Sequence, residues 1–76
     1  MIPVAIVKAA DEHGWKVGAV QQRRKLLWIS LGKGNVSIYI WRNKSRHTWG
    51  RAFRGNALTA VLNTQDKVVA FLALAT

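Results

Sequence analysis

The sequence contains no cysteine, only three acidic residues and a single proline. Without cysteine the chain can form neither a disulfide framework nor a thiolate metal site, which favours an intracellular, cytoplasmic protein. The longest uncharged apolar stretch covers residues 68–75, whereas a membrane-spanning helix needs about 20 apolar residues. Residues 1–13 have no basic n-region, so a signal peptide is not expected.

Basic and apolar residues dominate what is present. Half of the 76 residues are hydrophobic, and 12 Lys and Arg against 3 Asp and Glu give a formal net charge of +9. The length suits a single domain, residues 1–76, that buries about 60% of its unfolded surface. The apolar content argues against a disordered basic tail. The charge favours an anionic partner.

The first half of the chain predicts one helix followed by strands. Pro3 suits a helix start and Gly14 a helix end, so a helix is expected over residues 3–13. The period then changes to two and predicts strands over residues 16–20, 25–31 and 36–41. Residues 21–24 are expected to form a polar loop, and Gly32 and Gly34 suit a tight turn between the last two strands.

The pairing expected across this hairpin separates two kinds of side chain. One face becomes aliphatic, and the other becomes aromatic and polar. A slip by one residue would mix the two faces, so the pattern supports the hairpin. The expected pairs are Leu31 with Val36, Ile29 with Ile38 and Leu27 with Ile40 on the aliphatic face, and Ser30 with Ser37, Trp28 with Tyr39 and Leu26 with Trp41 on the other.

The second half allows more than one reading. Residues 42–46 form a polar loop, and residues 47–54 a strand weakened by Gly50. We expect a strand over residues 57–62 and a helix over residues 65–75, capped by Asn63 or Thr64. One long helix from residue 56, or a terminal hairpin turning at residues 64–66, are the alternatives. The fold class is α+β: an N-terminal helix, an antiparallel meander of three to five strands and a C-terminal helix, with the helices on the aliphatic face.

The charges are segregated along the chain. Residues 13–65 contain no acid, yet removing Lys8 and Lys67 from the twelve Lys and Arg leaves ten in this span. In a meander the first and third connections emerge at the same end of the sheet, so two basic loops are expected to meet there. The expected patch contains Arg23, Arg24, Lys25, Arg42, Lys44 and Arg46, and Arg51 and Arg54 are expected to extend it.

Aromatic residues are expected beside this patch. Trp28, Tyr39 and Trp41 fall on one face of the hairpin, and Trp49 is a further candidate. Flat rings next to cations can stack bases while the cations neutralise phosphates. Such residues in a small domain belong to the core in roughly two cases of three. A homodimer interface is another alternative.

No constellation for catalysis or cofactor binding stands out. No Gly-rich phosphate loop precedes a helix, no carboxylate pair suits acid–base chemistry, and no metal-ligand cluster is present. A ribonuclease using His13 and His47 is the best enzymatic reading, but nothing is arranged around either histidine. We therefore expect no enzyme, no cofactor and no metal.

The sequence thus predicts a small, non-enzymatic protein that binds DNA or RNA by the phosphate backbone with weak sequence preference. The alternative is an inhibitor or adaptor, such as a virus-encoded one, that binds an acidic surface of a host protein. Neither expected helix has the cationic amphipathic pattern of a membrane-surface helix, so no membrane partner is expected.

Overall fold

The computed structural model describes residues 1–75 and has the predicted α+β fold. At the C-terminus it contains a strand followed by a helix, which resolves the three alternatives in favour of the expected one. The elements in chain order are α1 (Val4–Glu12), β1 (Lys16–Val17), β2 (Gln21–Arg23), β3 (Leu26–Lys33), β4 (Val36–Asn43), β5 (Thr48–Arg54), β6 (Ala57–Leu62) and α2 (Gln65–Leu74).

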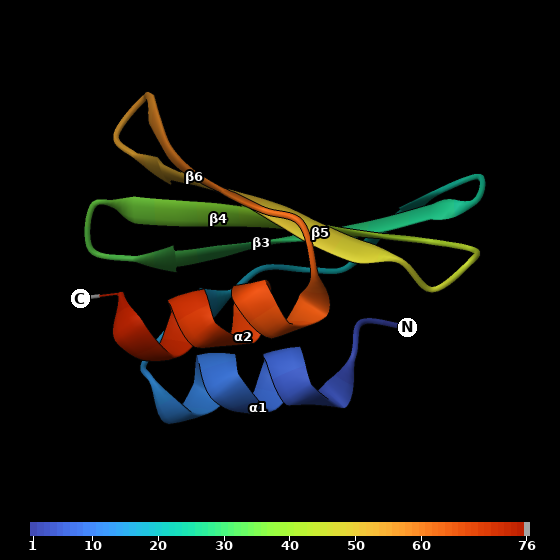
Figure 1. Cartoon of the computed structure of the whole chain (residues 1–76), viewed down its shortest axis with the longest axis horizontal. Coiled ribbons are helices and arrows are strands. Elements are labelled where there is room, and N and C mark those ends of the chain that lie inside the picture. Colours follow the sequence, from blue (N-terminus) through green and yellow to red (C-terminus); the bar gives the residue numbers. More distant parts are fainter. Residues whose placement is uncertain (76) are drawn as a thin grey trace.

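The strands form one antiparallel sheet, and both helices lie on the same side of it (Figure 1). The strand order is β1-β3-β4-β5-β6, and β2 pairs with β3 on the same side as β1. The molecule therefore has two layers, a helical layer and a sheet. The second face of the sheet is not covered by any element of residues 1–75 (Figure 1).

The edge beside β3 differs from the prediction. The expected strand over residues 16–20 is limited to β1, and the expected loop over residues 21–24 is mostly the strand β2. Gly18 is the last residue in contact with β3 before the interruption. Its amide donates to the Ser30 carbonyl, and a Cβ there would lie 2.9 Å from Ser30 Oγ. The chain leaves β3 after Gly18 and returns at Gln21, which pairs with Trp28.

The faces of the β3–β4 hairpin are as predicted, but all six expected pairs are wrong by two residues. The turn contains only Gly34 and Asn35, because Lys33 pairs with Val36. Gly34 has a φ of 59°, a conformation that glycine adopts at little cost. A shift of two preserves each side chain's face and changes its partner. The observed pairs are Leu31 with Ile38, Ile29 with Ile40, Leu27 with Arg42, Gly32 with Ser37, Ser30 with Tyr39, Trp28 with Trp41 and Leu26 with Asn43.

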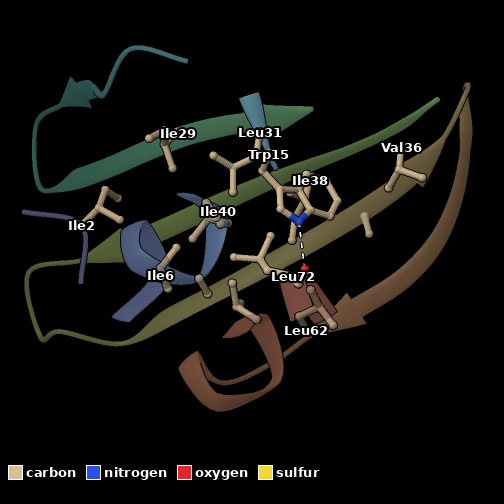
Figure 2. Close-up of a cluster of buried hydrophobic side chains, with 14 residues drawn as sticks. Ile2, Ile6, Trp15, Ile29, Leu31, Val36, Ile38, Ile40, Leu62 and Leu72 are labelled. Carbon is tan, nitrogen blue, oxygen red and sulfur yellow. Dashed lines mark hydrogen bonds between the residues drawn. The ribbon is translucent and has the colours of Figure 1, made fainter. Parts of the chain in front are cut away.

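The core lies between the helices and the aliphatic sheet face (Figure 2). Ile6 and Leu72 of the helices and Ile38 and Ile40 of the sheet are almost completely buried. Trp15 joins them, and its indole Nε1 donates to the Leu72 carbonyl at 2.9 Å. This tryptophan is the only one of the four whose side chain is buried in the core.

Two local features place α2 on the sheet. Thr64 caps the helix, since its hydroxyl accepts from the Lys67 amide at 3.2 Å. Gly50 in β5 allows close approach, because a Cβ there would lie 3.4 Å from Val68 Cγ2 and 3.1 Å from the Tyr39 carbonyl. Neither helix among residues 1–75 is long and apolar enough to cross a membrane.

Candidate nucleic-acid interface

Two basic turns meet at one end of the sheet. Leu26 pairs with Arg23 on one side and with Asn43 on the other, so the β2–β3 turn lies beside the β4–β5 connection. Both project from the right of the sheet in Figure 1, the end at which the N-terminus lies. We call the six cations of these segments the basic rim: Arg23, Arg24, Lys25, Arg42, Lys44 and Arg46.

The β4–β5 connection of the rim is held by hydrogen bonds. The Asn43 side chain accepts from the His47 amide at 2.9 Å, and the Arg46 amide donates to the Asn43 carbonyl at 3.0 Å. Half-buried Arg42 donates from Nη1 to the Thr48 hydroxyl at 3.0 Å. This loop therefore presents its cations from a defined backbone.

No carboxylate within residues 1–75 forms an ion pair with a rim cation. The single ion pair found within residues 1–75 joins Lys8 and Glu12 in α1, at 3.9 Å. Asp11 and Glu12 lie at the end of α1 that is distant from the rim, and Asp66 lies in the first turn of α2. The rim therefore keeps its positive charge for a ligand.

A cavity of about 580 Å³ opens beneath the rim, between it and the start of α1. Leu27, Ile2 and Pro3 give it apolar walls, and Gln22 and Asn43 contribute amides. None of the three carboxylates lines it. Five of the six rim residues line this cavity, namely Arg24, Lys25, Arg42, Lys44 and Arg46. Arg23 is the exception, because its pairing with Leu26 places it on the opposite sheet face.

The predicted aromatic residues lie on the uncovered sheet face, which we call the open face. Trp28, Trp41 and Trp49 are half-buried, and Tyr39 is 37% exposed. The Trp41 ring contacts two of the others, with centroids 6.2 Å from Tyr39 and 6.3 Å from Trp49. The reading of these residues as core is thus wrong, because the helices cover the other face.

Two further aromatic side chains extend this cluster and were not among the predicted binding residues. Phe53 meets the Tyr39 ring edge-on at 5.8 Å, and the His47 ring stacks on Trp49 at 5.4 Å. The β4–β5 register pairs Ser37 with Phe53 and so places Phe53 on the open face. The even spacing of Trp49, Arg51 and Phe53 along one strand was the available signal.

The two arginines expected to extend the patch go to different places. Arg51 pairs with Tyr39 and lies on the open face, inside the aromatic cluster. Arg54 pairs with Val36, beside the Gly34–Asn35 turn at the other end of the sheet. The prediction that Arg54 extends the rim is therefore wrong, because β5 runs the whole length of the sheet.

The two histidines, which were the best enzymatic candidates, lie at opposite ends of the sheet. His13 follows α1 at the end near β1, which pairs with the far end of β3. His47 lies in the rim connection and stacks on Trp49. Within residues 1–75, no group of three or more His, Cys, Asp or Glu side chains is placed to hold a metal ion.

Comparison of the chain with protein-family models, with curated proteins and with solved structures finds no match. Function must therefore be inferred from the rim and the open face themselves.

Proposed function

We propose that this protein binds nucleic acid, and that the basic rim contacts the phosphate backbone without catalysing a reaction. The observation that supports the proposal most is the convergence of six cations at one end of the sheet with no carboxylate paired to them among residues 1–75. Phosphate contacts of this kind dominate the affinity of nucleic-acid-binding proteins.

Weak sequence preference follows from the arrangement of the helices. Both helices pack on the sheet through their apolar sides, and neither projects from the rim as a groove-reading helix does. The rim offers arginine, lysine and amide groups, which suit phosphates and sugars. Such contacts position a ligand without reading its sequence.

Two single charge reversals test the proposal. Lys44 and Arg54 are both exposed, but only Lys44 belongs to the rim. Lys44→Glu is expected to weaken binding to an oligonucleotide roughly tenfold or more, since two unit charges change beside a phosphate. Arg54→Glu changes the net charge equally and is expected to have a much smaller effect. Equal losses in the two variants would contradict a rim-centred site.

A second candidate function is binding to an acidic protein surface, as an inhibitor or adaptor. The observation that favours it is the partly exposed cluster of tryptophan, tyrosine and arginine on the open face, since these residues dominate interface hot spots. A pull-down after nuclease treatment separates the candidates. A defined protein partner retained after nuclease favours the inhibitor, and loss of all partners favours nucleic acid.

A further inference from the structure

Three tryptophans stand side by side on the open face. The register pairs Trp28 with Trp41 and Trp41 with Trp49, so they form one row across β3, β4 and β5. We call this set the tryptophan row. Neighbouring strands lie about 4.8 Å apart. The row therefore runs perpendicular to the strands and parallel to the end of the sheet that carries the rim.

The tryptophan row lies close to the rim. Arg23 of the rim lies on the open face with Trp28, because it pairs with Leu26, and Trp28 is separated from the Arg24–Lys25 turn by two residues of β3. The connection that carries Lys44 and Arg46 joins the strands of Trp41 and Trp49. A chain of phosphates that passes over Arg23 and the two turns would therefore keep the groups attached to it within reach of the rings.

The rings are accessible and nearly parallel where they meet. Trp41 and Trp49 stack with planes inclined by 16°, and His47 continues the stack beyond Trp49 with an inclination of 21°. All three tryptophans are half-buried, and the register places them on the open face of the sheet. Flat, partly exposed rings at the border of a cationic rim are the surface on which bases stack in single-strand-binding proteins.

The positive charge of the open face indicates which kind of partner binds there. Arg51 lies in the next register row and Arg23 lies at the rim end of the same face, whereas the three carboxylates belong to the helices. A second copy of the chain placed on this face would bring its arginines against these arginines and would add a further net charge of +9. The resulting repulsion disfavours a homodimer. An anion with flat apolar groups is complementary to the same surface.

We propose that the tryptophan row is a stacking platform for unpaired bases, so that the ligand is single-stranded nucleic acid whose phosphates follow the basic rim. This inference rests on the proposed function. In a duplex each base is already stacked and paired, so its flat face cannot reach the rings. Phosphate contacts alone would give the opposite preference, because a duplex carries the higher charge density.

The test compares one mixed-sequence DNA strand of twelve nucleotides with its twelve-base-pair duplex, using the full chain at low salt. We expect the single strand to bind roughly tenfold more tightly, and to quench tryptophan emission, since each stacked base adds appreciable affinity. The duplex is expected to bind without comparable quenching.

Single substitutions of aromatic residues test whether the tryptophan row is the surface on which the bases stack. Trp28→Leu and Trp49→Leu are each expected to weaken single-strand binding roughly tenfold and to leave duplex binding nearly unchanged. Phe53→Leu is the control, since Phe53 is an aromatic residue of the same face two register rows farther from the rim. Urea unfolding establishes that each variant is folded. Quenching of the tryptophan emission of the wild-type protein by the single strand tests the platform without any substitution.

The possible failures are distinguishable. Equal or tighter duplex binding, or folded tryptophan variants with unchanged single-strand affinity, would overturn the platform and leave nucleic-acid binding standing. Failure of both oligonucleotides to bind at low salt would overturn both proposals. Polyglutamate that binds as tightly as the single strand, with the same dependence on Trp28 and Trp49, would assign the face to an acidic polypeptide instead.

Discussion

Two arginines of the rim have backbone conformations that glycine adopts more easily. Arg24 has a φ of 57° and Arg46 a φ of 65°. In the turns at the other end of the sheet, Gly34 and Gly55 have φ values of 59° and 60°. For a residue with a Cβ this left-handed conformation costs about 1–2 kcal/mol. Both strained residues line the cavity beneath the rim, and backbone strain is concentrated at functional sites in proteins.

The substitution Arg24→Gly separates folding from binding at this position. Glycine removes the backbone strain of the folded state but also makes the unfolded chain more flexible. Because the two effects oppose each other, the free energy of unfolding is expected to stay constant or to rise by up to about 1 kcal/mol. The same variant is expected to bind nucleic acid several-fold more weakly, because one cation is lost. Urea titration and an oligonucleotide titration measure the two effects. Parallel loss of stability and affinity would contradict this division.

At the scale of elements, hydrogen bonds from Trp15 and Lys33 hold the C-terminal end of α2. Trp15 donates to the Leu72 carbonyl, which belongs to the last turn of the helix, where carbonyls lack partners within the helix. Lys33 Nζ donates to the Ala75 carbonyl at 3.3 Å and lies 5.8 Å from the centroid of the Trp15 ring. The ring of Phe71 packs 6.2 Å from that of Trp15. One side chain thus links β1, β3 and α2.

Replacement of Trp15 by phenylalanine tests this link. The variant retains a ring but leaves the buried Leu72 carbonyl without its donor and creates a small cavity. We expect a loss of about 2–4 kcal/mol in the free energy of unfolding. Guanidinium or urea unfolding at neutral pH measures it. A loss below about 1 kcal/mol would show that the hydrogen bond and the ring contribute little.

The β3–β4 hairpin shows which aspects of an element can be predicted. The period of two assigned Ile29, Leu31 and Ile38 to one face correctly, because alternation depends on neighbours in the chain. The pairing partners depend on the length of the turn. Gly32 and Lys33 belong to β3, so the turn contains only two residues. Placement of Trp28 opposite Trp41 therefore could not be predicted without the turn length.

At the scale of the whole molecule, both helices cover one sheet face (Figure 1). The register places the aromatic residues of β3, β4 and β5 on the other face. The meeting of the rim loops could be predicted, since alternate connections of a meander share an end. The exposure of the aromatic face could not be predicted, because the sequence does not show how many layers cover a sheet. The misplacement of Arg54 has a different cause, since the predicted strand over residues 47–54, in an antiparallel meander, already carries residue 54 to the end of the sheet opposite the rim.

The central claim is that the rim neutralises phosphates, and the salt dependence of binding tests it most directly. Neutralisation of about five phosphates on a single strand predicts a slope near −3.5 for the logarithm of the association constant against the logarithm of salt concentration. Titration of the twelve-nucleotide strand at several salt concentrations measures this slope. Affinity that falls with this slope would support phosphate contacts at the rim, whereas a slope near zero would contradict them.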